Sequence, residues 1–160
     1  MYWQHFPQFF DDNTLFEKVY DQISTICKPV IYNMYGKRFE SKRLSCIYAD
    51  QEVYSGMENL SWEEAPKEII EMRRMIEENF GKNIDYVLVH IYRDGLDKIA
   101  WHCDKEAMNS DIFSVSLGAT RRFIMKDKVS DEKTEFRLKS GDLFHMLGIE
   151  EGKKVVKVNM

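Results

Sequence analysis

The chain has 160 residues, of which 44% are hydrophobic and 31% charged, and its formal net charge at pH 7 is −4. These values are typical of a single domain that is large enough to bury a continuous core without disulfides or structural metals. The acidic balance argues against a protein that coats nucleic acid indiscriminately, but local basic clusters keep a phosphate-binding face open as an alternative to solvated surface pairs. These clusters are Lys37-Arg38, Lys42-Arg43, Arg121-Arg122 and Lys153-Lys154 with Lys157.

Cysteine usage and apolar runs bear on the cellular compartment. Cys27, Cys46 and Cys103 show no CxxC spacing, so we expect reduced thiols rather than a disulfide framework or a zinc site. No apolar run reaches the length of a bilayer span, and the first residues have neither the basic nor the apolar region of a signal peptide. We therefore expect a cytosolic or nuclear protein with no membrane partner.

Two segments in the N-terminal half show helical spacing of apolar residues. The spacing predicts a first helix over residues 15–25, after Asp11-Asp12-Asn13-Thr14, which offers several N-cap side chains. A second helix is predicted to begin near Ser61, where Ser61-Trp62-Glu63-Glu64 has the form of a capping box, and to end at Gly81. We expect both helices to be scaffold.

From residue 85 onward the pattern changes to short segments that are rich in β-branched and aromatic residues and are separated by turn residues. The predicted strands are residues 86–92, 112–117, 122–125, 134–138 and 143–146. Such short strands at near-regular spacing predict an α+β fold in which a double-stranded β-helix, or jelly roll, carries both helices on one sheet. We expect one domain over residues 1–160, with a helical part in residues 1–84 and the jelly-roll core in residues 85–160.

His102 and Asp104 are the residues that point most directly to chemistry. On an extended segment, side chains two residues apart project from the same face, so this imidazole and this carboxylate can meet at one metal ion. They supply two of the three ligands of a 2-His-1-carboxylate triad, which binds mononuclear iron and leaves positions open for a co-substrate and dioxygen. A His-x-Asp pair also occurs by chance in many proteins, so the pair alone does not establish a metal site.

Longer segments add an order and spacing that a single motif lacks. They are residues 86–106, 112–123 and 140–143, and upstream of them Met34-Tyr35-Gly36-Lys37, Arg43 and Tyr54-Ser55-Gly56. Together, over about residues 29–148, they resemble the AlkB family of iron(II)- and 2-oxoglutarate-dependent dioxygenases, nearest its eukaryotic DNA-repair branch. The resemblance implies oxidative demethylation of N-alkylated bases in DNA or RNA with release of formaldehyde, and it favours duplex DNA. The alternative fold is a generic cupin.

The resemblance also implies roles for residues around the metal. His102 and Asp104 would bind Fe(II), and Tyr92 would form a hydrogen bond with the co-substrate 2-oxoglutarate. Family members usually have Asn two residues before this Tyr, where this chain has His90. An imidazole can still donate a hydrogen bond to the co-substrate, but it is bulkier and titrates near neutral pH.

A second set of residues would bind the nucleic acid, and the resemblance places most of it in residues 1–84. The set is Met34, Tyr35, Gly36, Arg43, Tyr54, Ser55 and Glu106. Tyr35 would be the wedge of a finger that fills the gap left by a flipped base, and Tyr54 would stack on that base. Glu106 would reach the polar edge of the base. The structural alternatives are a hairpin tip for Tyr35, a core aromatic for Tyr54 and a solvated charge for Glu106.

The family pattern breaks after Gly141. Members carry a second iron-binding His and then a strand with two Arg residues that hold the far carboxylate of 2-oxoglutarate, and this chain has neither. We do not expect His145 to replace the second His, because strand alternation places it on the face opposite Met146. We expect the missing C-terminal strand to leave an unpaired sheet edge that favours self-association. A catalytically silent nucleic-acid-binding relative is therefore the alternative function.

Overall fold

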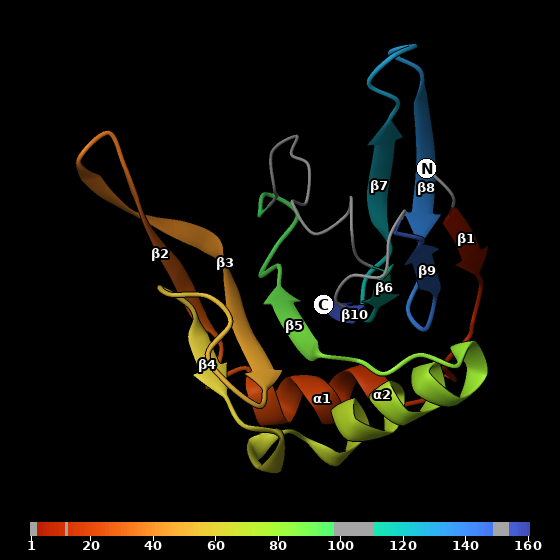
Figure 1. Cartoon of the computed structure of the whole chain (residues 1–160), viewed down its shortest axis with the longest axis horizontal. Helices are drawn as coiled ribbons and strands as arrows, with labels where there is room; N and C mark the ends of the chain where they lie inside the picture. The colour runs from red at the N-terminus through yellow and green to blue at the C-terminus, as the bar shows by residue number, and fades with distance from the viewer. Residues whose placement is uncertain (1–2, 12, 98–110, 149–153) are drawn as a thin grey trace.

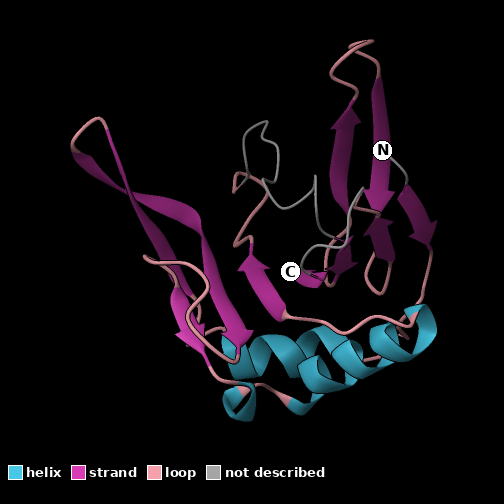
Figure 2. Cartoon of the chain, viewed as in Figure 1, coloured by secondary structure: helices cyan, strands magenta, loops and turns pink. Residues whose placement is uncertain are grey.

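The computed structural model describes residues 3–11, 13–97, 111–148 and 154–160. Its helices are α1 (Leu15–Ile23), α2 (Lys67–Phe80) and the 3-10 helix η1 (Trp62–Glu64). Its strands are β1 (Trp3–Phe6), β2 (Lys28–Met34), β3 (Lys37–Ala49), β4 (Glu58–Leu60), β5 (Tyr86–Ile91), β6 (Asp111–Ser116), β7 (Arg121–Lys126), β8 (Lys133–Leu138), β9 (Leu143–Met146) and β10 (Lys154–Asn159). The strands dominate and the helices lie together on one side (Figures 1 and 2), which confirms the predicted α+β class.

Local signals predicted both helices, with differences at their ends. Helix α1 ends at Ile23 instead of residue 25, and Thr14, which precedes it, forms no side-chain cap hydrogen bond. The capping box at Ser61 is formed, but it caps η1, and α2 begins only after Pro66. The break falls at Ala65, which is extended because a residue before proline is disfavoured in the helical region. Helix α2 ends at Gly81 with a φ of 62°, as predicted. Within the described ranges, no helix has the length and apolar character that crossing a bilayer requires.

The larger sheet has the strand order β1-β9-β6-β10-β5-β3-β2, and β4 pairs with β3 outside this path. Strand β10 is parallel to both of its neighbours, β5 and β6, and the other neighbours on the path are antiparallel. The prediction of a missing strand with an open edge is therefore wrong here, because β10 is hydrogen-bonded on both sides. Val155, Val156 and Val158 explain its central position, since they are β-branched and buried.

The core lies between the sheet and the two helices. Val19 and Ile23 of α1 and Ile69, Met72 and Ile76 of α2 are buried against one face of the sheet. On the sheet side this cluster contains Cys46, Tyr48, Val87, Val89, Phe113, Val115, Val156 and Val158. Figure 1 shows both helices below the sheet, as predicted. Among the described residues, the other face of the sheet carries a smaller cluster, and a site can form on this face.

The hairpin of β7 and β8 forms a separate two-stranded sheet. It is attached to β9 through aromatic rings, with centroid distances to Phe144 of 4.9 Å for Phe136 and 5.2 Å for Phe123. Trp3 of β1 joins this contact and stacks on Phe144 at 5.6 Å. The ring cluster packs the hairpin against the sheet, as expected of a second layer.

Asp142 anchors the N-terminal segment to the start of β9. Its carboxylate accepts hydrogen bonds from the backbone N–H of Gln8 at 2.9 Å and of Lys139 at 3.0 Å, and it contacts His5 Nε2 at 2.9 Å. Burial raises the pKa of Asp142, but these hydrogen bonds outweigh burial and lower the pKa below its ordinary value. The carboxylate is therefore ionised at neutral pH and holds β1 in place.

Cys27 and Cys46 are free thiols in the core, as predicted from the cysteine pattern. Their Sγ atoms are 3.0 Å apart and form a hydrogen bond. The hydrogen bond to Cys46, together with burial, raises the pKa of Cys27 far above its ordinary value. The Cys27 thiol is therefore an unreactive packing group. The third cysteine, Cys103, lies outside the described residues.

Candidate functional site

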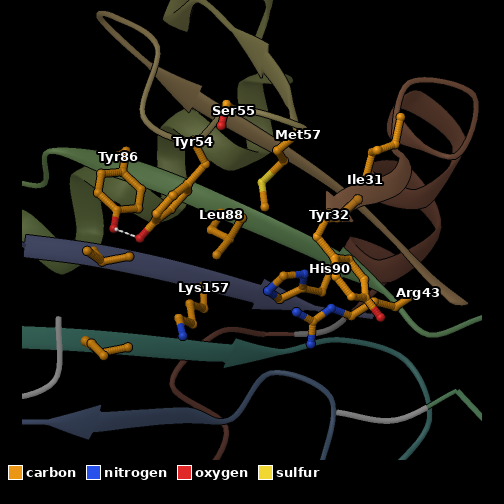
Figure 3. A pocket seen from close by; sticks show the side chains of 13 residues that line it. Ile31, Tyr32, Arg43, Tyr54, Ser55, Met57, Tyr86, Leu88, His90 and Lys157 are labelled. Atoms are coloured by element: carbon orange, nitrogen blue, oxygen red, sulfur yellow. Dashed lines mark hydrogen bonds between the residues drawn. The ribbon is translucent and has the colours of Figure 1, made fainter. Parts of the chain in front are cut away.

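A cavity of about 300 Å³ lies on the sheet face opposite the helices (Figure 3). Strands β2, β3, β5, β6 and β10 and the loop between β3 and β4 form its walls. The lining residues are Val30, Ile31, Tyr32, Arg43, Tyr54, Ser55, Met57, Tyr86, Leu88, His90, Ile112, Val155 and Lys157. The cavity thus brings together four of the residues that the sequence predicted for the site: Arg43, Tyr54, Ser55 and His90.

Tyr54 forms an aromatic wall of this cavity. Its hydroxyl lies 3.2 Å from that of Tyr86, and the two rings meet edge to face with centroids 6.2 Å apart. The side chain of Asn59 holds the loop from inside, because it donates to the carbonyls of Tyr54 at 2.7 Å and Met57 at 2.8 Å and accepts from the N–H of Val53 at 3.0 Å. The wall is therefore fixed before any ligand binds.

Gly56 allows the same loop to approach β2 closely. Its φ is 78°, and a Cβ atom at this position would lie 2.2 Å from the carbonyl oxygen of Ile31. The two backbones are also joined by a hydrogen bond, which the N–H of Ile31 donates to the carbonyl of Gly56 at 2.9 Å. Only glycine fits both the backbone conformation and the space. This contact sets the position of Ser55 at the cavity.

Polar and cationic groups occupy the floor of the cavity and one of its walls. His90 is buried, and its Nδ1 lies 2.7 Å from Oγ of Ser45, the residue directly opposite it on β3. Arg43 Nε is buried and has no hydrogen-bond partner among the described residues. Lys157 of β10 alternates with core residues and so lies on the cavity face. A buried unpartnered N–H and a lysine in one cavity suit a ligand with carboxylate or phosphate groups.

Tyr92, the other residue predicted to contact the co-substrate, lines a different cavity of about 360 Å³. The guanidinium of Arg121 lies over its ring, 4.1 Å from the centroid. The rings of Tyr92 and His90 are 6.4 Å apart, so the two residues are neighbours. The structure does not place both of them on one cavity wall.

The predicted finger residues form the tip of the β2–β3 hairpin. Met34 pairs with Lys37, and the two residues between them have φ values of 52° for Tyr35 and 71° for Gly36, as in the two-residue turns that match strand twist. Tyr35 is 94% exposed. Figure 1 shows the hairpin projecting from the sheet, away from the helices. Tyr35 is thus a hairpin tip, and this position is also the one a wedge requires.

The metal ligands predicted from the sequence, His102 and Asp104, lie outside the described residues, as does Glu106. Among the residues that are described, no group of three or more His, Cys, Asp and Glu side chains could hold a metal ion. His145 stacks on Phe113 at 4.1 Å and meets Phe80 at 5.2 Å, on the helix side of the sheet. This confirms that His145 points away from the cavity. Burial lowers its pKa and outweighs the nearby Asp111 carboxylate, so the ring is neutral at pH 7.

Among the lining residues that sequence reasoning did not assign to the site, three carry a polar group on the side chain: Tyr32, Tyr86 and Lys157. Tyr86 and Tyr32 resemble ordinary strand aromatics, and only the fold shows that they share a cavity. Lys157 had a usable signal, because a lysine between Val156 and Val158 on a buried strand alternates toward the opposite face.

Comparison with known proteins identifies the family. The sequence matches the family model for the 2OG-Fe(II) oxygenase superfamily over residues 5–151, and the chain belongs to this superfamily. It is similar to the DNA oxidative demethylase ALKBH2 of Arabidopsis thaliana, with 29% identity over 153 residues, which cover 89% of this chain and 47% of that protein. The predicted likeness to AlkB dioxygenases is thereby confirmed. Iron(II) and 2-oxoglutarate are the metal and co-substrate that the superfamily implies.

Shorter matches agree with this result. The human DNA oxidative demethylase ALKBH2 is 42% identical over 60 residues, which cover 36% of this chain and 23% of that protein. The human alpha-ketoglutarate-dependent dioxygenase alkB homolog 3 is 37% identical over 65 residues, which cover 39% of this chain and 23% of that protein. The chain thus spans about half the length of the Arabidopsis relative, and the matches to the two human relatives cover a smaller share of those proteins.

Proposed function

We propose that the chain is an AlkB-like dioxygenase domain that oxidatively demethylates N-alkylated bases in nucleic acid, with DNA favoured over RNA, and releases formaldehyde. The observation that carries this proposal is the cavity, where the aromatic wall of Tyr54 and the cationic groups of Arg43 and Lys157 face one space. A flipped, methylated nucleotide has a ring that stacks on an aromatic wall and phosphates that pair with cations. Two of the relatives, the Arabidopsis and human ALKBH2 proteins, are DNA oxidative demethylases, which agrees with this choice.

The residues of the chain would bind and orient the base. Tyr54 stacks on its face, held by the contact with Tyr86 and by Asn59. Leu88 and Val155 line the same space with apolar surface and exclude water from the reacting methyl group. Tyr35, at the tip of the projecting hairpin, fills the gap in the duplex from which the base has moved.

Bound Fe(II) and 2-oxoglutarate would supply the oxidising chemistry, which no protein side chain provides. In the proposal, His102 and Asp104 hold the iron. His90, whose ring is fixed by Ser45, and Tyr92 contact the co-substrate. The buried Arg43 Nε, which has no partner among the described residues, supports an anionic ligand in the cavity, such as a carboxylate of 2-oxoglutarate. The double-stranded β-helix, the active domain over residues 1–160 and action in the cytosol or nucleus belong to the same proposal.

A catalytically silent nucleic-acid-binding relative is the second candidate, and one observation favours it. The cavity face of β10 carries Val155, Lys157 and Asn159, so this strand presents no imidazole there. His145 lies on the other side of the sheet. Under this candidate, Tyr35 and the basic residues of the hairpin would still bind nucleic acid, and only the chemistry would be lost.

An assay of demethylation separates the two candidates. The chain is incubated with Fe(II), 2-oxoglutarate, dioxygen and an oligonucleotide that carries N-methylated bases, and mass spectrometry follows loss of the methyl group. We expect turnover by the native chain, none by His102→Ala and slower turnover by Tyr54→Leu. Binding of the oligonucleotide without turnover by the native chain would contradict the enzymatic proposal and support the silent relative.

A further inference from the structure

Two aromatic rings on the β2–β3 hairpin form an exposed stacked pair. Tyr32 and Phe39 are cross-strand partners, with ring centroids 5.6 Å apart and an angle of 17° between the ring planes. Their residues are 43% and 37% exposed. Adjacent exposed aromatics on a projecting hairpin are not explained by the core, which lies at the other end of these strands.

The charge around this pair is unlike that of the whole chain. Residues 28–43 contain five basic residues and one acidic residue, whereas the chain has a net charge of −4. The basic residues are Lys28, Lys37, Arg38, Lys42 and Arg43, and the acidic one is Glu40. An excess of positive charge beside an aromatic surface is complementary to a phosphate backbone with its bases exposed.

The pair is also continuous with the cavity. Tyr32 is itself a cavity wall, beside Arg43 and across from Tyr54, as Figure 3 shows. Tyr32 and Met34 are two residues apart on β2, so their side chains lie on the same face of the hairpin. Met34 is the cross-strand partner of Lys37, next to the hairpin tip. An aromatic and basic track therefore leads from the cavity along the hairpin.

We propose that Tyr32 and Phe39 form a second base-stacking platform, which holds an unpaired nucleobase next to the one in the cavity. The inference rests on the proposed function, because it requires that the chain binds nucleic acid. The platform recognises the π-face of a base and not its hydrogen-bonding edge, so it tolerates any base at that position. Its effect is to keep the neighbouring strand unstacked while the target base occupies the cavity.

The test measures binding of a single-stranded oligonucleotide that contains 2-aminopurine, by anisotropy for affinity and by fluorescence quenching for stacking. The variant is Phe39→Leu, because Phe39 does not line the cavity. We expect affinity to fall by about tenfold, within the range measured for the loss of one base–aromatic stack, and the quenching to decrease. Phe39→Trp should restore both signals. The slope of affinity against salt should stay unchanged, because no cation is removed.

Tyr20→Leu is the matched control, because Tyr20 is 38% exposed but lies on α1. It should leave affinity and quenching at native values, and circular dichroism should show that all variants are folded. Native binding with no effect of Phe39→Leu, while Tyr35→Ala weakens it, would overturn the platform but not the proposed function. Failure of the native chain to bind any oligonucleotide would overturn both.

Discussion

Arg43 offers a prediction that couples stability to binding. Its Nε is buried without a hydrogen-bond partner among the described residues, and a buried unsatisfied N–H costs about 1–3 kcal/mol. Met keeps an unbranched apolar stem at this position and removes the polar head. We therefore expect Arg43→Met to raise the free energy of unfolding by about 1 kcal/mol, which raises the melting temperature by roughly 2–4 °C for a domain of this size.

The same substitution should weaken binding of the anion that Arg43 meets. A hydrogen bond to a charged group contributes about 1.5–3 kcal/mol, so affinity should fall by roughly 10- to 100-fold. Thermal melting by circular dichroism measures the first effect, and titration with 2-oxoglutarate and with an oligonucleotide measures the second. The ligand that loses affinity identifies the anion at Arg43.

Arg122→Met is the control, because Arg122 has a side chain that is 61% exposed and only a 3.5 Å contact with Glu135. Such a surface pair contributes little, so its loss should change stability by less than about 0.5 kcal/mol and should not affect either ligand. The reasoning about Arg43 would be refuted if Arg43→Met lowered the melting temperature and left both affinities at native values. That result would mean that the arginine is a structural group.

Three more predictions test the scaffold and the site. Asp142→Asn should lower stability by about 1–3 kcal/mol at neutral pH. Because the folded pKa of Asp142 is depressed, denaturant titrations should show that this difference is present above the ordinary pKa of about 4 and vanishes as the pH falls through the folded value. Gly56→Ala should destabilise the fold more than Gly81→Ala. Both residues have a positive φ, but of the two added Cβ atoms only the one at Gly56 would meet a carbonyl oxygen. Equal decreases of the melting temperature in thermal melts would contradict the close approach of the Gly56 loop to β2. His145→Leu should leave iron affinity unchanged in a metal titration, because His145 lies on the helix side, and a weakened affinity would make it a ligand.

The parts of the fold that could be predicted from the sequence are those in which local pattern and tertiary packing agree. Strand β5 reads as a continuous apolar run because the sheet buries both of its faces. Strand β3 was missed, because its first half is polar and belongs to the projecting hairpin, where no core selects apolar residues. Strand β10 was missed as a sheet member because its parallel pairing with β5 and β6 depends on contacts far along the chain.

The candidate site shows the same division. Arg43, Tyr54 and Ser55 were predicted from motif order. Arg43 lies near His90 because β3 pairs with β5, and Tyr54 and Ser55 belong to the loop that follows β3. Motif order did not point to Lys157. Alternation with Val156 and Val158 indicates which face it takes, but its place at this cavity depends on β10 lying beside β5. The distribution of charge along the hairpin was visible in the sequence, but its link to the cavity required the position of Tyr32.

The central claim, that this chain assembles an iron and 2-oxoglutarate site, is tested most directly by an anaerobic titration with Fe(II) and 2-oxoglutarate. A chelated ferrous complex produces a visible charge-transfer band. We expect the band with the native chain and its loss in His102→Ala, with both proteins folded by circular dichroism. A folded native chain that shows no band at millimolar 2-oxoglutarate would contradict the claim and leave nucleic-acid binding as the function of the domain.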